Sequence, residues 1–430
     1  MSTVRINFEK VCGKIKPMHG VNGGPVTVRG VSTDKLFSCA KIPFSRIHDS
    51  SLIRAYGGEH IVDVQNIFRD FDKDENDSNN YDFTLTDIYL KKIAACGTQV
   101  FYRLGSSIEC EEKKYGVVEP KDYNKYARIC EHIIMHYNYG WADGYNMNIE
   151  YWEVWNEPDG GMSFWTGTEE KFVEFFTVVA GYLKEKFPQL KIGGPAVASP
   201  TSALWDKLLP YLKEHNVQLD FYSYHAYRFF PNDHKNDVTY IEGVLKKYGL
   251  PRTEIINNEW NFAIGWEGDC WIESVKSIIS QKGASYALAT MSVLQNTTLD
   301  ALMYYDASPS IYNGLYDFYT FNPLKTYYVF EEFGKLYELK NQVVVDCDDD
   351  DLFVLSAKNE NKSATTLTYY NYDDSKENKK ISIKLESGFK NKDVYLIRDV
   401  NNPQLILSTN EKEIELQLNN FDIVFIECNK

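Results

Sequence analysis

The feature that most constrains this chain is an alternation of two kinds of segment over roughly the first 330 residues. A short apolar or β-branched run is followed by a polar loop and a stretch with apolar residues at helical spacing, and eight such runs can be placed. Strands that alternate with helices imply right-handed crossovers and a parallel sheet, and eight strands close such a sheet into a barrel. We therefore predict an α/β fold of the (β/α)8, or TIM-barrel, type. The predicted strands are 18–22, 45–48, 99–104, 150–155, 191–195, 220–225, 254–259 and 301–306.

Two of the predicted helices have clear boundaries. An apolar face recurs every three to four residues over Glu169–Lys186, behind a cap at Thr166 or Thr168. A second helix is predicted over 87–96, with Gly97 in the position that commonly terminates a helix. Neither a dinucleotide-binding glycine motif nor a P-loop motif is present, so nucleotide-binding α/β folds are not favoured.

The pattern changes after about Lys340, where short alternating runs are separated by turn residues. Such runs are typical of an antiparallel β-sandwich. We therefore predict a catalytic barrel over 13–338 and a C-terminal antiparallel β-sandwich accessory domain over 339–430. Because chain termini commonly lie near one another, the N-terminal segment 1–12 is predicted to add a strand to that domain.

Composition narrows the function classes. The 46 basic and 61 acidic residues give a net charge of −15, which repels nucleic acid and anionic membranes. No signal peptide or membrane span is visible, and the eight cysteines are scattered, so we expect a soluble cytoplasmic protein with reduced thiols. The aromatic content of 15% suits sugar ligands, although aromatic residues also fill cores. A homo-oligomer is left open.

Acidic residues follow several of the predicted barrel strands, at the end where barrel enzymes place their reactive groups. Glu157 and Glu259, each preceded by an asparagine, form the strongest pair. Cleavage of a glycosidic bond needs two such groups, one to protonate the departing oxygen and one to attack the anomeric carbon or activate water. The separation of the carboxyl groups decides between retention and inversion, and the sequence does not reveal it.

Four motifs together resemble glycoside hydrolase family 39, the family of β-xylosidases and α-L-iduronidases in a clan of retaining (β/α)8 glycosidases. They are Glu-Val-Trp-Asn-Glu-Pro at 153–158, Gly-Gly-Pro at 193–195, Tyr-His-Ala-Tyr at 224–227 and Asn-Glu-Trp-Asn at 258–261. The resemblance covers most of residues 16–335. It implies that Glu157 is the general acid/base, that Glu259 is the nucleophile and that Asn156 binds the sugar 2-hydroxyl. No metal or organic cofactor is required.

The resemblance further implies that sugar-binding groups are supplied by His48, His225, Tyr227 and Asp306. Among the tryptophans, those after the fourth and seventh strands are the best candidates for stacking on a sugar, namely Trp165, Trp266 and Trp271.

The resemblance favours a retaining exo-glycosidase that acts on a small oligosaccharide or glycoside, with a β-D-xyloside as the first choice of substrate. Tyr227 occupies the position where uronide-cleaving members carry a basic residue, which favours a neutral sugar. A uronide stays open as a substrate because three arginines could enter the site and bind its carboxylate, namely Arg46, Arg54 and Arg228. Arabinosides and β-glucosides or galactosides stay open as well, as do transglycosylation and a non-catalytic carbohydrate-binding role.

The loop 68–82 is longer than a compact connection in such a barrel. It is predicted either to wall one side of the mouth, which would suit action on chain ends, or to form a solvated excursion. Its acidic residues depart from a calcium loop at the sixth and twelfth positions, so calcium is not favoured.

Overall fold

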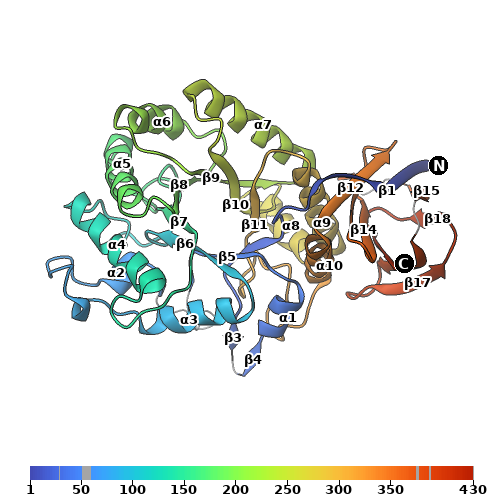
Figure 1. Ribbon diagram of the computed structural model, residues 1–430, viewed down its shortest axis with the longest axis horizontal. Helices are drawn as coiled ribbons and strands as arrows, with labels where there is room; N and C mark the ends of the chain where they lie inside the picture. The colour runs from blue at the N-terminus through green and yellow to red at the C-terminus, as the bar shows by residue number, and fades with distance from the viewer. Residues whose placement is uncertain (29, 51–59, 374–376, 387–388, 430) are drawn as a thin grey trace.

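The computed structural model describes residues 1–28, 30–50, 60–373, 377–386 and 389–429. Its larger part is a closed barrel of parallel strands in the order β10-β11-β2-β5-β6-β7-β8-β9, which confirms the predicted barrel (Figure 1). Each barrel strand overlaps one of the eight predicted runs. The strands are β2 (Gly20–Asn22), β5 (Phe44–Ile47), β6 (Gln99–Leu104), β7 (Tyr151–Val154), β8 (Lys191–Val197), β9 (Phe221–Arg228), β10 (Glu254–Phe262) and β11 (Ala301–Tyr304).

Helices surround the barrel. The helix α5 has the predicted bounds, Glu169–Lys186, and its cap is Thr168, whose side chain accepts a hydrogen bond from the Lys171 amide at 3.3 Å. The helix α3 ends one residue before its predicted end, and Gly97 follows with φ 77°. The helices are α1 (Asp34–Cys39), α2 (Val64–Ile67), α3 (Thr84–Ala95), α4 (Tyr123–Tyr139), α5, α6 (Leu204–Glu214), α7 (Pro231–Tyr248), α8 (Gly268–Ile278), α9 (Gln281–Gln295) and α10 (Lys325–Leu339). The short hairpin of β3 (Thr27–Val28) and β4 (Val31–Ser32) and the 3-10 turn η2 (Ser78–Asn80) lie in the connections.

The interior of the barrel at the amino ends of the strands is filled by apolar side chains. Phe101, Tyr151 and Phe221 form an aromatic group with ring centroids 5.2–5.7 Å apart. Ile256, Ala301 and Met303 complete this buried cluster. The barrel is therefore closed at this end, as expected of a packed core.

The C-terminal segment forms a second β-rich domain in which nine strands make one sheet, in the order β17-β16-β19-β14-β13-β12-β1-β15-β18. The N-terminal strand β1 pairs antiparallel with β12 and parallel with β15, so the sheet is mixed rather than purely antiparallel. Both termini lie in this domain (Figure 1). Its strands are β1 (Ser2–Lys14), β12 (Asn341–Cys347), β13 (Leu352–Lys358), β14 (Lys362–Tyr369), β15 (Lys379–Glu386), β16 (Lys390–Ile397), β17 (Gln404–Thr409), β18 (Glu413–Leu418) and β19 (Ile423–Asn429).

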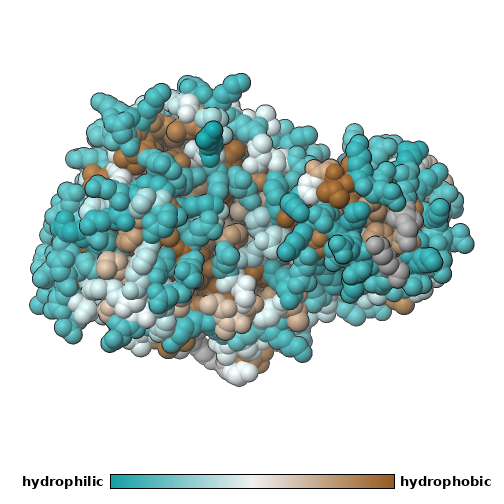
Figure 2. Space-filling model, in the orientation of Figure 1, coloured by the Kyte–Doolittle hydropathy of each residue, from teal (hydrophilic) through white to brown (hydrophobic). Residues whose placement is uncertain are grey.

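The sheet domain packs against helices α9 and α10 of the barrel. Ser285 and Thr368 share a 2.7 Å hydrogen bond, and the Gln281 amide donates to the Phe421 carbonyl at 2.6 Å. Lys335 on α10 forms a 2.7 Å ion pair with Glu427 on β19. The face drawn in Figure 2 is covered mainly by hydrophilic side chains.

The loop 68–82 folds against α4. Glu75 accepts a 2.6 Å hydrogen bond from Arg128, and the Phe71 ring stacks on Tyr126 at 6.1 Å. These contacts anchor the loop on the first turns of α4. None of the helices in the described part of the chain has the length and apolar character needed to cross a membrane.

Candidate active site

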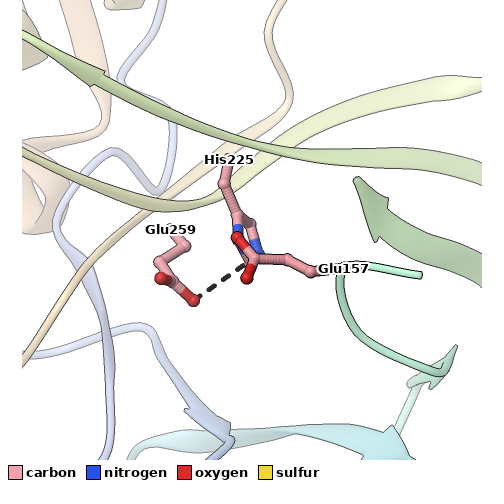
Figure 3. Close-up of side chains that lie close together, drawn as sticks. All are labelled: Glu157, His225 and Glu259. Atoms are coloured by element: carbon pink, nitrogen blue, oxygen red, sulfur yellow. Dashed lines mark hydrogen bonds and ion pairs between the residues drawn. The ribbon is translucent and has the colours of Figure 1, made fainter. Parts of the chain in front are cut away.

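The two glutamates singled out in the sequence face each other at the carboxyl ends of the barrel strands. Glu157 follows β7 and Glu259 lies within β10. His225 on β9 lies beside them. Three atoms lie within 4.8 Å of one another: one carboxylate oxygen of each glutamate and one ring nitrogen of His225. Figure 3 shows the three side chains gathered around one point. The barrel therefore brings together residues that are 68 and 34 positions apart in the chain (225 − 157 and 259 − 225).

The turn that carries Glu157 has an unusual backbone. Trp155 has φ 76° and Glu157 has φ 44°, in the left-handed region that costs a non-glycine residue roughly 1–2 kcal/mol. Hydrogen bonds from the Trp155 amide to the Leu104 carbonyl (3.0 Å) and from the Glu157 amide to the Ala196 carbonyl (2.9 Å) hold the turn between β6 and β8. Such a conformation persists only where surrounding contacts hold it, and here the two hydrogen bonds to β6 and to Ala196 on β8 do so.

Arg46 at the end of β5 links the groups beneath the two glutamates. Its side chain is fully buried, and its Nε donates to Glu153 at 2.7 Å. Its Nη2 donates to Asn156 Oδ1 at 2.6 Å, and its Nη1 donates to Asn22 at 3.0 Å and to Glu259 at 3.3 Å. Because Asn156 Oδ1 faces Arg46, the amide NH2 of Asn156 points the other way, where it can donate to a ligand hydroxyl.

The electrostatics of the pair differ between its two members. Burial raises the pKa of Glu157 to about 8, and the negative charges of Asp159 and Asp49 add to the effect while Arg46 opposes it. Burial also raises the pKa of Glu259, to about 7, against the stabilising influence of His225, Arg46 and the Tyr227 hydroxyl. Burial thus raises the pKa of both carboxyl groups, and the pair keeps a proton near neutral pH.

His225 lies against both glutamates. Its Nδ1 is 2.6 Å from Glu157 Oε1 and its Nε2 is 3.5 Å from Glu259 Oε2. Burial lowers the pKa of His225 to about 4, while the negative charge of Glu259 opposes this effect. The imidazole is therefore neutral near neutral pH, and its two nitrogens lie against the two carboxyl groups.

Of the remaining residues expected to bind sugar, Tyr227 contacts the pair directly. The Tyr227 hydroxyl donates to Glu259 Oε1 at 2.5 Å. His48 is buried, and its Nε2 lies 3.4 Å from Asp49; burial and the charge of Arg46 hold the pKa of His48 well below its usual range. Asp306, two residues after the end of β11, is buried and accepts a 2.7 Å hydrogen bond from Ser310.

The tryptophans separate into two groups. Trp266 is 55% exposed and lies 4.9 Å from Tyr227 and 5.7 Å from Trp271, so these rings extend the site outward from Glu259. Trp165, in contrast, is buried beside Trp155 and its indole N–H donates to the Thr168 carbonyl at 3.1 Å. The expectation that Trp165 stacks on sugar is therefore wrong, because the start of α5 folds over it and places it in the core.

The arginines considered for a uronide are engaged by protein groups. Arg228 pairs with Asp237 at 2.9 Å, and each nitrogen of Arg46 already has a partner. Arg54 lies outside the described residues.

Three site residues were missed in the sequence. Glu153 is fully buried, and its Oε1 accepts hydrogen bonds from Ser223 (2.6 Å) and Asn258 while its Oε2 binds Arg46. Asn22 on β2 and Asn258 on β10 complete the group. The sequence signal for Glu153 is a charged residue within the apolar run that forms β7. A buried carboxylate of this kind requires a hydrogen-bonding or oppositely charged partner.

Glu157, His225 and Glu259 are also the group of described residues whose donor atoms lie close enough together to share a cation. A cation bound there would occupy the carboxylate oxygens that face the pocket, and it would compete with any substrate that uses them.

A parallel eight-stranded barrel with two facing carboxylates at its strand ends has the architecture of a barrel glycosidase. The chain belongs to glycosyl hydrolases family 39, whose sequence profile matches residues 44–405.

Curated relatives share only part of their length with this chain. A β-xylosidase of Geobacillus stearothermophilus is 28% identical over 188 residues, which are 41% of this chain and 36% of that protein. A β-xylosidase of Caldicellulosiruptor saccharolyticus is 31% identical over 117 residues, 26% of this chain and 23% of that protein. The matches thus span about a third or less of these relatives.

Solved structures show the same fold over the whole chain. A glucosidase from Croceicoccus marinus superposes with a TM-score of 0.81 at 19% identity, covering 100% of this chain and 99% of that one. A monomeric β-xylosidase from Caulobacter crescentus superposes with a TM-score of 0.73 at 14% identity, again over 100% and 99%. At these identities the likeness concerns the fold alone.

Proposed function

We propose that this protein is a retaining exo-glycoside hydrolase that releases a terminal neutral sugar, with β-D-xylosides as its substrates. The observation that carries the proposal is the approach of Glu157 and Glu259 oxygens to within 4.8 Å. Retaining glycosidases hold their carboxyl groups about 5–5.5 Å apart, whereas inverting enzymes leave about 6.5–9.5 Å for a water molecule. The short separation supports a double displacement.

In the first displacement, a Glu259 oxygen forms a bond to the anomeric carbon while the bond from that carbon to the leaving oxygen breaks. Glu157 transfers its proton to the leaving oxygen. This step requires a protonated Glu157 and an ionised Glu259, and the raised pKa values of both groups support a proton retained on the pair near neutral pH. Asn156, oriented by Arg46, is placed to donate to the sugar 2-hydroxyl, an interaction that strengthens in the transition state.

In the second displacement, a water oxygen bonds to the anomeric carbon and the ester bond to Glu259 breaks. Glu157, now a carboxylate, takes the proton from that water. Once Glu259 is esterified, its negative charge no longer raises the proton affinity of Glu157, so the same residue serves as acid and then as base.

The choice of a neutral sugar rests on the basic groups around the site. Arg46 and Arg228 are both held by protein partners, and Tyr227 uses its hydroxyl on Glu259. The β-xylosidases among the relatives support xylose as the sugar to test first.

The test is the intact mass of the protein after incubation with 2-deoxy-2-fluoro-β-xylosyl fluoride, followed by peptide mapping. We expect one stable adduct on Glu259, and none in Glu259→Gln. An adduct on another residue would contradict the assignment of the nucleophile. Turnover of xylosides with inversion at the anomeric carbon, followed by NMR, would contradict the retaining mechanism.

A further inference from the structure

The carboxylate of Glu153 has no part in the two displacements, yet it is fully buried at the centre of the site. It lies on β7, in register with Arg103 on β6 and Gly193 on β8. Its hydrogen-bond partners among the described residues are Arg46, Ser223 and Asn258, which come from β5, β9 and β10. Glu153 therefore joins four of the eight barrel strands beneath the two facing glutamates.

Every partner of Glu153 donates a hydrogen bond to it. An ionised carboxylate accepts from all of them, whereas an amide would present an NH2 group to at least one donor. A charged, buried guanidinium also needs an opposite charge nearby, and Glu153 is the nearer of the two carboxylates that Arg46 contacts, at 2.7 Å against 3.3 Å for Glu259. The position thus requires a carboxylate.

The charge of Glu153 has a consequence for the reacting pair. Arg46 interacts with the charges of Glu153, Glu259 and Glu157 together. An ionised Glu153 at 2.7 Å offsets the positive charge of Arg46. Without Glu153, the whole charge of Arg46 would favour the carboxylate forms of Glu259 and Glu157, and the acid would lose its proton at lower pH. Among the described residues, the other charged or titratable groups around this cluster include His48, Asp49, Arg103 with its partner Asp63, Asp159 and His225.

We propose that Glu153 is a positioning residue that holds Arg46 in place for Asn156 and Glu259 and neutralises it, so that Glu157 keeps the proton it must deliver. This inference rests on the proposed function for its role in turnover, while its electrostatic part is measurable on the protein without any substrate.

The experiment compares Glu153→Gln with the wild type and with a matched control, Glu254→Gln. Glu254 is also a strand carboxylate in a 2.7 Å ion pair, with Lys191, but at the opposite end of the barrel. Carbodiimide labels protonated carboxyl groups, so the pH midpoint for labelling of Glu157, read by peptide mapping, reports its proton affinity directly. The alkaline limb of kcat/KM for an aryl xyloside is measured in parallel.

In Glu153→Gln we expect the labelling midpoint of Glu157 and the alkaline limb to move together to lower pH by roughly one unit, the order expected for a unit charge several ångströms away. Glu254→Gln should move neither. An unchanged midpoint in a folded Glu153→Gln, or an equal shift in both variants, would overturn the inference. Labelling that shifts as expected in a protein that hydrolyses no glycoside would support the electrostatic part and refute the proposed function instead.

Glu153→Asp keeps the charge but shortens the side chain, and it tests the positioning part even where Glu153→Gln does not fold. We expect the labelling midpoint to stay within about 0.3 units of the wild type, since the charge is retained, while kcat falls at least tenfold with KM changed less than threefold. An unchanged kcat in Glu153→Asp would show that the placement of Arg46 does not depend on Glu153.

Discussion

The two ends of the barrel are built from the same eight strands but hold opposite kinds of side chain. At the amino ends, Phe101, Tyr151 and Phe221 belong to a dry apolar cluster. At the carboxyl ends, Arg46 and Glu153 are fully buried charges, surrounded by amides and carboxylates. The apolar end therefore contributes mainly to stability. The charged end holds the candidate active site, and its buried charges and left-handed backbone cost free energy through desolvation and strain.

The largest expected effect comes from Glu259→Gln at the charged end. The amide has nearly the same shape but is a poor nucleophile, so we expect kcat on an aryl xyloside to fall by at least about 10⁴-fold. The melting temperature should stay the same or rise at neutral pH, since a carboxyl whose pKa is raised by folding destabilises the folded state when it ionises. Residual activity above one per cent would show that another group attacks the sugar.

Glu157→Ala should have an effect that depends on the leaving group. Loss of the proton donor is expected to slow poor leaving groups by about 10²–10⁴-fold, and activated aryl groups far less in the first displacement. The measurement is kcat/KM across a series of aryl xylosides of differing phenol pKa. An equal loss for good and poor leaving groups would show that Glu157 is not the acid.

Phe221→Ala tests the apolar end. Removing this buried ring leaves a cavity and should lower the stability by about 3–5 kcal/mol, seen as a lower melting temperature or urea midpoint. At a temperature where the variant is folded, kcat is expected to remain within about threefold of the wild type. If kcat fell as far as in Glu157→Ala while the stability was unchanged, the apolar end would contribute to activity and not mainly to stability.

The pH profile of kcat/KM tests the raised pKa values of the two glutamates. Below pH 7 Glu259 is increasingly protonated and cannot attack, and above pH 8 Glu157 loses the proton it donates. We therefore expect a narrow optimum between these values, with each limb approaching a tenfold change per unit of pH. A rate that stays constant from pH 5 to pH 9 would contradict this protonation scheme.

The smallest expected effect is that of metal removal. Prolonged dialysis against EDTA should leave kcat unchanged, because the proposed displacements need no cation. Added Zn²⁺ should inhibit by binding Glu157, His225 and Glu259, whose donor atoms lie within 4.8 Å. Loss of activity on chelation that Zn²⁺ restores would place a metal in the reaction.

Local features made part of this structure predictable. The helix α5 has the bounds read from its apolar spacing, because a cap and an amphipathic face act over a few residues. The strands β12 and β17 carry weak local signals: β17 is mostly exposed, and β12 is buried at only a few positions, so neither shows the alternation of a half-buried strand. The parallel pairing of β1 with β15 joins the two ends of the chain, and nothing local specifies it.

The sequence by itself determined the barrel and the facing pair of glutamates, since eight repeated runs admit few closed arrangements and an acid after a barrel strand is expected to face the mouth. Only the tertiary structure decided that Trp165 belongs to the core and that Glu153, inside an apolar run, neutralises Arg46. It alone also showed that Arg228 is held by Asp237. The physical reason is that burial and pairing depend on side chains from other strands, which become neighbours only when the barrel closes.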